Sequence, residues 1–102
     1  MKKYNFNSGT KFQKIVWNML AKIPEGRVVT YQELAIEIGY PKSFRAVASA
    51  CGKNPHIPEI PCHRVVRKDG GLGGYSPEGG IKRKKYMLEK EGHKFNNGKI
   101  IL

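Results

Sequence analysis

From Thr10 onward, apolar residues recur at intervals of three and four, which is the spacing of one face of an α-helix. Thr10 and Gln13 stand three positions apart at the start of this stretch, as a capping box requires. The sequence Pro-Glu-Gly at 24–26 ends it. The pattern therefore predicts an amphipathic helix with the buried face Phe12, Ile15, Val16, Met19, Leu20 and Ile23.

A second helix is predicted after a short extended piece at 27–29. Thr30 and Glu33 form another capping box at its start. A glycine after the last apolar position is a common helix end, so the helix stops at Gly39. Its inward-facing residues are Leu34, Ala35 and Ile38.

A third helix is predicted from Phe44 to Gly52, after a tight connection at 41–43 that makes Ser43 its cap. Two short helices joined by a few residues are typical of a helix-turn-helix, although an ordinary helical hairpin has the same pattern. The narrow buried face of this helix comprises Ala46, Val47, Ala50 and Cys51.

The second half of the chain contains two loops, one short strand, one helix and one hairpin. Residues 54–61 and 72–80 are rich in proline or glycine and read as loops, with a strand at 65–66 between them. A last helix is predicted at 81–91, with an exposed basic start at 82–85. Asn97-Gly98 is the signal of a two-residue hairpin turn. The fold class is therefore a mostly α, winged helix-turn-helix-like small domain with a minor β hairpin.

The length and charge of the chain narrow its class. One hundred and two residues make one domain, 1–102, which begins with a short polar arm at 1–9. Lysine and arginine outnumber aspartate and glutamate 19 to 8, and the formal net charge is +11. This imbalance favours a nucleic-acid partner; the alternatives are a solubility surface or an adaptation to a salty cytosol.

Neither a membrane nor a metal is indicated. The N-terminus lacks the apolar run of a signal peptide, and no stretch is long and apolar enough to span a bilayer. We therefore expect a cytoplasmic, nucleoid-associated protein with reduced thiols. The two cysteines and three histidines do not fall into paired zinc spacings, so we expect no metal and no cofactor.

Residues 60–65, Ile-Pro-Cys-His-Arg-Val, carry the strongest candidate chemistry. A thiolate is the nucleophilic form of cysteine, and a nearby imidazole or guanidinium lowers the pKa of the thiol. Pro61 would present Cys62 on a stiff turn. Taken alone, Cys62 could equally be an inert core residue.

The loops on either side of Cys62 could wall a pocket. Glycines in the second loop allow the backbone to approach a flat ligand. Tyr75 could stack on such a ligand and Ser76 could hydrogen-bond to it. A flexible surface loop is the alternative for this segment.

Motifs spread over residues 10–92 occur in the order found in one family of DNA-repair proteins. Through these motifs, the chain resembles the 6-O-alkylguanine-DNA alkyltransferases (methylated-DNA–protein-cysteine methyltransferases), and specifically their active-site domain. The most specific part is Pro-Cys-His-Arg-Val at 61–65 with Arg-Ala-Val upstream at 45–47. The full set adds Trp17, the segments 23–26, 30–31, 34–35, 54–55 and 73–76, and Glu91-Gly92.

The resemblance implies a catalytic set. Cys62 corresponds to the residue that takes the alkyl group from the 6-oxygen of guanine and keeps it as a thioether. His63 corresponds to the residue that removes the thiol proton through a water. Glu91 corresponds to the carboxylate that orients this histidine, and Asn54 to the asparagine that braces the turn.

The resemblance also implies how DNA is held. Arg45 corresponds to an arginine that enters the base stack when the damaged nucleotide turns out, and Tyr31 to a residue that crowds the neighbouring phosphate. The recognition helix, from Ser43 and Phe44 through Ala46, would enter the minor groove. Matches to the guanine pocket are Val65, Tyr75 and Ser76, with Cys51 where the family usually carries a larger apolar residue.

Two functions remain open under this resemblance, and a third without it. Most members have an additional N-terminal domain, whereas chains this short are typical of alkyltransferase-like proteins, which bind alkylated DNA without repairing it and usually carry tryptophan instead of the cysteine. Because Cys62 is present, we expect a single-turnover transferase that acts as a monomer on double-stranded DNA containing alkylated guanine. The third alternative is a winged-helix regulator with an inert cysteine.

Overall fold

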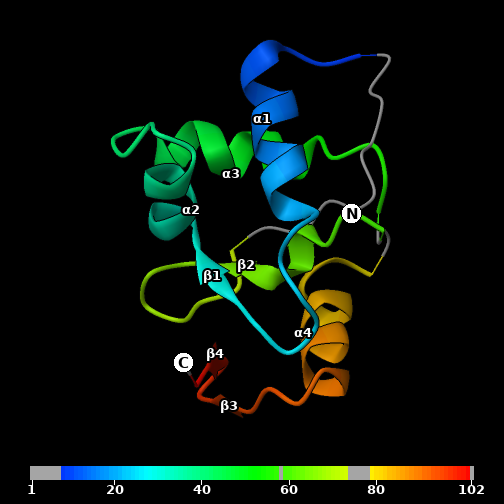
Figure 1. The fold of residues 1–102 in the computed structure, drawn as a ribbon. Helices are drawn as coiled ribbons and strands as arrows, with labels where there is room; N and C mark the ends of the chain where they lie inside the picture. Colours follow the sequence, from blue (N-terminus) through cyan, green and yellow to red (C-terminus); the bar gives the residue numbers. More distant parts are fainter. Residues whose placement is uncertain (1–7, 58, 74–78, 102) are drawn as a thin grey trace.

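The computed structural model describes residues 8–57, 59–73 and 79–101. These residues form four α-helices, one 3-10 helix (η1) and four short strands, which pair into two small two-stranded sheets (Figure 1). In order they are α1 Lys11–Leu20, β1 Val29–Thr30, α2 Tyr31–Glu37, α3 Phe44–Gly52, η1 Cys62–Arg64, β2 Val65–Val66, α4 Gly80–Lys90, β3 Phe95–Asn96 and β4 Lys99–Ile100.

Helices α1, α2 and α3 pack around the larger of two apolar clusters. The capping boxes predicted at Thr10 and Thr30 are both confirmed, with each hydroxyl accepting from the backbone N–H three residues on. The indole Nε1 of Trp17 donates to the Ala50 carbonyl at 2.8 Å and thereby ties α1 to the end of α3. The cluster includes Val16, Trp17, Leu20, Leu34, Ala35, Val47 and Ala50, all buried.

The predicted helix-turn-helix is confirmed as α2, a tight connection and α3. Gly39 leaves α2 with a φ of 88°, a left-handed conformation that favours glycine, and the N–H of Tyr40 donates to the carbonyl of Ala35 at 2.9 Å. Ser43 occupies the cap position of α3, but its side chain makes no capping hydrogen bond. The prediction that Ala46 is buried is wrong: it is exposed, and it lies on the outer face of α3.

A short parallel pairing joins the two halves of the chain. Val29 pairs with Val65, and Thr30 with Val66. Both extended pieces were predicted, but the pairing between them was not. Because β1 leads directly into α2 and β2 follows η1, the pairing brings the start of α2 next to the turn that carries Cys62.

Helix α4 and the C-terminal hairpin pack on a second apolar cluster of Val66, Leu72, Leu88 and Ile100. The predicted hairpin is confirmed, with β3 and β4 antiparallel and Asn97 and Gly98 at positive φ in the turn. The predicted exposed start of this helix is wrong at one position. Lys84 is only 1% exposed, because it lies on the same helical face as Leu88 and points into the protein.

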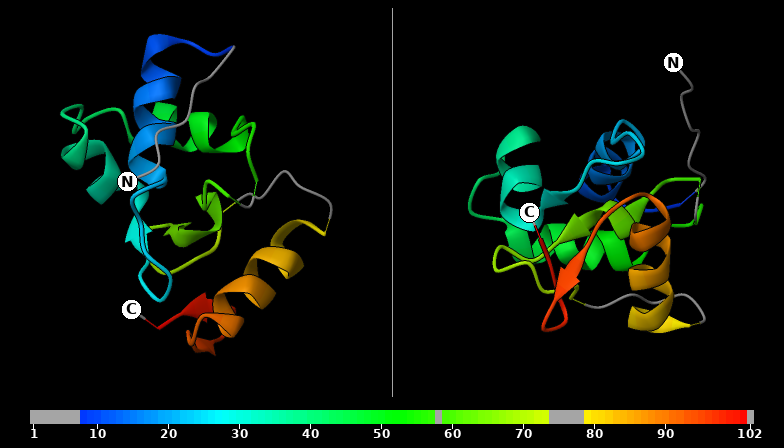
Figure 2. Two further views of the ribbon diagram at one scale, coloured as in Figure 1. Left: turned by 45° about the vertical axis from the view of Figure 1, so that its right-hand side comes forward. Right: turned by 90° about the horizontal axis from the view of Figure 1, so that it is seen from below.

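The two ends of the molecule carry different elements. Helices α1 and α3 lie at one end, and α4 and the hairpin lie at the other, with β1, β2 and η1 between them (Figures 1 and 2). Within the described residues, no helix combines the length and the apolar character needed to cross a membrane.

Candidate functional site: a buried cysteine beside a histidine–glutamate–arginine network

Cys62 opens the 3-10 turn η1 in the middle of the molecule. Its side chain is 5% exposed. The loop before it is held by Asn54, whose amide Nδ2 donates to the Ile60 carbonyl at 2.7 Å and whose Oδ1 accepts from the N–H of His56 at 3.0 Å. These two hydrogen bonds fix the backbone two residues before the sulfur, and the part of Asn54 in catalysis stays a prediction.

The resting state of Cys62 is a thiol. Burial raises the pKa of Cys62, and a hydrogen bond from the Asn54 side chain and the charge of Lys84 oppose this only in part. The expectation that a neighbouring imidazole or guanidinium lowers this pKa is not met. A thiol with a raised pKa becomes a nucleophile at neutral pH only where a base can remove its proton.

His63, the next residue, belongs to a network that crosses 28 positions of sequence. Its Nε2 lies 2.9 Å from Oε2 of Glu91, the residue that caps the C-terminal end of α4. Arg64 donates to both oxygens of the same carboxylate, from Nε at 3.0 Å and from Nη2 at 2.8 Å. The Nη1 of Arg64 also donates to the Ile23 carbonyl at 2.8 Å, which anchors the network to the loop after α1.

Electrostatics fix the protonation states in this network. Burial acts to raise the pKa of Glu91, but hydrogen bonds from Arg64 and His63 outweigh it and bring the pKa to about 2. Burial lowers the pKa of His63 although Glu91 favours its charged form. His63 is therefore a neutral imidazole at pH 7, and its contact with an ionised carboxylate assigns the proton to Nε2. The lone pair of Nδ1, which is buried and has no hydrogen-bond partner among the described residues, is left to accept a proton.

Lys84 and Tyr31 form a second buried group close to the thiols. The Lys84 ammonium donates to the Leu72 carbonyl, lies 3.5 Å from the Tyr31 hydroxyl and sits 5.8 Å from the centre of that ring. Burial lowers the pKa of Lys84 to about 8, and burial raises the pKa of Tyr31. Tyr31, expected to crowd a phosphate, thus points largely inward, where its hydroxyl lies against the start of the glycine-rich loop at Gly73.

Cys51 lies at the C-terminal end of α3 and is 6% exposed. Burial, followed by the nearby Cys62, raises the pKa of the Cys51 thiol to about 12. Cys51, Cys62 and Lys84 are therefore close enough for the charge of each to affect the pKa of the others. Val65, also expected in the pocket, is fully buried in β2.

The outer face of α3 carries the residues expected to contact DNA. Arg45 and Ala46 are exposed, and Ser43 and Phe44 are partly exposed. The Arg45 guanidinium lies 5.9 Å from the centre of the Phe44 ring. Tyr75 and Ser76, the remaining predicted pocket residues, lie outside the described residues.

Two residues of this site were missed as site residues by the sequence analysis. Arg64 was recognised only as part of a motif, because its carboxylate partner is far away in the chain. Lys84 was taken as surface charge. Its spacing of four from Leu88 was the available signal, since it places both side chains on one helical face.

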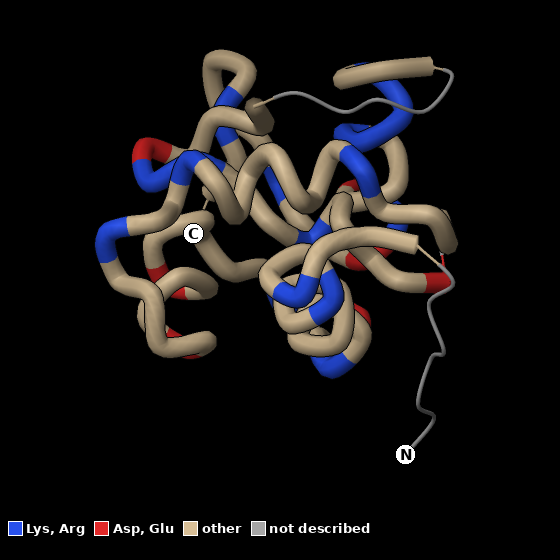
Figure 3. The backbone as a smooth tube through the Cα atoms, turned by 90° about the horizontal axis from the view of Figure 1, so that it is seen from above, with Lys and Arg blue, Asp and Glu red and all other residues tan. Residues whose placement is uncertain are grey.

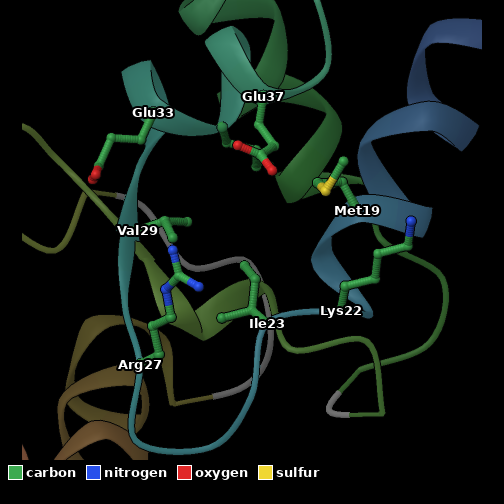
Figure 4. Close-up of a pocket in the computed structure, with 8 residues that line it drawn as sticks. Met19, Lys22, Ile23, Arg27, Val29, Glu33 and Glu37 are labelled. Carbon is green, nitrogen blue, oxygen red and sulfur yellow. The ribbon is translucent and has the colours of Figure 1, made fainter. Parts of the chain in front are cut away.

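A separate pocket of about 210 Å³ lies between the C-terminal end of α1, the strand β1 and α2 (Figure 4). It has an apolar floor and two cations and two carboxylates among its lining residues. These residues are Met19, Lys22, Ile23, Arg27, Val29, Glu33, Leu34 and Glu37. Neither Cys62 nor His63 lines it, so it is distinct from the reactive site. In the described part of the chain, no cluster of histidine, cysteine and carboxylate side chains could hold a metal ion.

Comparison with known proteins identifies the family. Residues 11–93 match the family model of the 6-O-methylguanine DNA methyltransferase DNA-binding domain. The chain belongs to this family. The match covers α1 through α4 and includes Cys62, His63 and Glu91.

Relatives within the family are longer. The Regulatory protein ada of Salmonella typhimurium is 54% identical over 86 residues, which are 84% of this chain and 24% of that protein. The methylated-DNA–protein-cysteine methyltransferase of the same organism is 46% identical over 85 residues, 83% of this chain and 48% of its own length. The chain thus spans about a quarter of the first relative and about half of the second.

Solved structures of the family show the same fold. The Mycobacterium tuberculosis OGT in complex with DNA matches with a TM-score of 0.78 and 48% identity, over 82% of this chain and 51% of that one. The S. pombe Atl1 in complex with damaged DNA containing O6-carboxymethylguanine matches with a TM-score of 0.75 and 32% identity. That match covers 90% of this chain and 88% of Atl1.

Proposed function

We propose that this chain repairs DNA by transferring an alkyl group from the 6-oxygen of guanine to Sγ of Cys62, once per molecule. The observation that carries the proposal is the Glu91–His63 contact of 2.9 Å directly beside the cysteine, with Arg64 holding the same carboxylate. A merely structural cysteine needs no oriented base. We further infer that the single unit 1–102 contains both the reactive residue and the DNA-contacting helix.

The chemistry follows from the protonation states. The sulfur attacks the alkyl carbon, the S–C bond forms as the C–O bond to guanine breaks, and the thiol proton moves through a water to Nδ1 of His63. Glu91 stabilises the imidazolium that results, as a carboxylate does in other oriented-base sites. The proton then passes to the departing guanine, so no charge remains on the products. The thioether is stable, which limits each molecule to one turnover.

The target base has to leave the duplex before the sulfur can reach it. Extrusion of a base costs a few kcal/mol, and less for a poorly paired lesion. We assign Arg45, exposed on α3, to the gap that the base leaves in the stack. The small side chain of Ala46 suits close approach to a narrow groove. Tyr31 acts indirectly, through its contact with Lys84 and with the glycine-rich loop. We assign this loop, including Tyr75 and Ser76, to the base pocket.

The decisive test is mass spectrometry of the protein after incubation with duplex DNA carrying an alkylated guanine. We expect a gain equal to one alkyl group, located on Cys62 and absent from Cys51. Binding to the same duplex should be strongly salt-dependent, with a log–log slope of roughly −4 to −5 if about four to six phosphates are neutralised. We also expect the protein to act as a monomer and to reside with the DNA in the cytoplasm.

A second function is favoured by one observation. The structure of S. pombe Atl1 in complex with damaged DNA containing O6-carboxymethylguanine shares the fold of this chain, with a TM-score of 0.75 and 32% identity. The alternative is therefore a lesion-binding protein that signals to another repair pathway. Tight binding to alkylated duplex with an unchanged mass of Cys62 would support this alternative and exclude transfer.

A further inference from the structure

Basic residues are not concentrated on the helix assigned to DNA. Helix α3 contains one cationic residue, Arg45, within its nine residues. Helix α4 contains four lysines and one arginine within its eleven residues and has a single exposed carboxylate, Glu89. The backbone trace likewise shows Lys and Arg on several sides of the protein (Figure 3). DNA binding through α3 alone therefore leaves most of the charge of α4 without a role.

The exposed cations of α4 share one face. Lys82, Tyr86 and Lys90 follow one another at intervals of four, opposite the buried Lys84 and Leu88. Tyr86 is 59% exposed at the centre of this face, and the Lys90 ammonium lies 5.4 Å from the centre of its ring. The tyrosine thus serves as a platform that holds a lysine.

The hairpin extends this face. The Lys85 ammonium lies 5.4 Å from the centre of the Phe95 ring on β3, and Lys94 is exposed immediately before that strand. Phe95 packs against the apolar cluster that anchors α4, so helix and hairpin form one unit. We call Lys82, Lys85, Tyr86, Lys90 and Lys94 the α4 surface.

The placement of these charges is unfavourable for the helix itself. Cations near the N-terminal end oppose the helix dipole, and the first turn of α4 contains no acidic residue. Lysines at successive positions also repel one another. An arrangement that costs local stability is expected where the charges serve an external anion.

We propose that the α4 surface binds the phosphate backbone of a second duplex DNA segment while α3 holds the first. The proposal rests on the proposed function only in assigning α3 to DNA. The two helices lie at opposite ends of the molecule (Figures 1 and 2), so a duplex seated on α3 leaves the α4 surface open. The surface offers lysine point charges rather than base-reading groups, so it recognises phosphate without regard to sequence. The protein would then bridge two DNA segments.

The test uses two short undamaged duplexes, one labelled with a donor dye and one with an acceptor, mixed with the full chain at low salt. Wild-type protein should bring the dyes together. The triple variant Lys82→Gln, Lys85→Gln, Lys90→Gln should lose this energy transfer and reduce the salt slope of total binding by roughly 3. The matched control, Lys11→Gln, Lys14→Gln, Lys22→Gln, removes the same charge from and just after α1 and should still bridge.

Alkyl transfer is measured in parallel on a single short alkylated duplex. The α4 triple variant should transfer within about twofold of the wild type, because Lys82, Lys85 and Lys90 are exposed whereas Lys84 and Leu88 form the buried side of α4. A tenfold loss would correspond to about 1.4 kcal/mol in the barrier. Transfer could fail in every variant while bridging persists, which would separate the two proposals. Bridging that is absent in the wild type, or retained in the α4 variant, overturns the second-duplex proposal. So does equal competition by an acidic peptide of matched charge.

Discussion

The two cysteines of this protein are buried to the same degree in the same apolar cluster, but they differ in the polar groups beside them. Cys51 is 6% exposed and Cys62 is 5% exposed, so exposure does not distinguish them. Burial raises the pKa of both thiols, and for Cys51 it reaches about 12. Cys62 differs in receiving a hydrogen bond from Asn54 and in being followed by the histidine that contacts Glu91.

The comparison shows which surroundings would make Cys62 reactive under the proposed function. Cys51 lies at the end of α3 among apolar side chains, and its backbone is part of the helix. The 3-10 turn after Pro61 places Cys62 between a braced loop and a network of polar side chains. A nucleophile is therefore made by the groups that take its proton and stabilise its anion, and a buried sulfur alone is not enough.

The largest expected effect is on transfer itself. Cys62→Ala should abolish the mass gain on alkylated DNA and retain binding, because the substitution removes the acceptor atom and leaves α3 intact. Cys51→Ala is the control and should gain one alkyl group as the wild type does. Labelling of Cys51 in the wild type would contradict the assignment.

Removal of the carboxylate should come next. Glu91→Gln should slow transfer by about 10²-fold, the usual contribution of an oriented base. Its pKa is lowered in the folded state, so the ionised group stabilises the fold above its ordinary pKa of about 4.3 and this contribution is lost as pH falls toward about 2. Urea titrations between these pH values should show a flatter pH dependence in the variant. An unchanged transfer rate would remove Glu91 from the mechanism.

Asn54→Ala should have an intermediate effect on both activity and stability. It removes the hydrogen bond that lowers the pKa of Cys62. It also removes two further hydrogen bonds of Asn54, to the Ile60 carbonyl and from the N–H of His56, so that the carbonyl keeps only the backbone N–H of Cys62. We expect a loss of about 1–3 kcal/mol in unfolding free energy and transfer slowed by about tenfold. A shift of the transfer rate profile to higher pH would be the specific sign, because simple loosening of the loop would not produce it.

Lys84→Met should reveal how much the burial of the Lys84 ammonium lowers the unfolding free energy. The pKa of Lys84 is lowered to about 8, so between about pH 8 and pH 10 the unfolded chain holds a proton that the folded chain has released. Stability from this residue therefore rises with pH in that window, by on the order of 1–2 kcal/mol. Urea titrations across this pH window should show the unfolding free energy of the wild type rising relative to that of the variant. A constant difference would mean that Lys84 stays charged.

The smallest effect is expected at the inert thiol. Cys51→Ala should cost about 1 kcal/mol of unfolding free energy, because it removes one buried sulfur from the end of α3. The transfer rate should stay within about twofold, a difference well under 1 kcal/mol in the barrier. A large loss of transfer in a folded variant would show that Cys51 shapes the guanine pocket.

Local elements were predictable to a degree that non-local contacts were not. Helix α1, α2 with its capping box and the Asn97-Gly98 hairpin followed from residues within four positions of one another. Ala46 was predicted to be buried and Lys84 to be exposed, and both predictions are wrong. The residue type did not decide the face, because a small alanine or a long lysine is compatible with either one. The Arg64 contacts with Glu91 and Ile23 could not be read from spacing at all.

The sequence by itself determined the helical segments, the basic balance and the Cys-His pair, because these depend on neighbours along the chain or on composition. Only the tertiary structure decided that the imidazole beside Cys62 contacts a carboxylate, that of Glu91. Strand β1 pairing with β2 and α4 ending beside η1 bring Glu91 to His63 and Lys84 toward both thiols. The pKa of each group depends on charges and burial within a few ångströms in space, and the chain reaches that arrangement only when its distant segments pack.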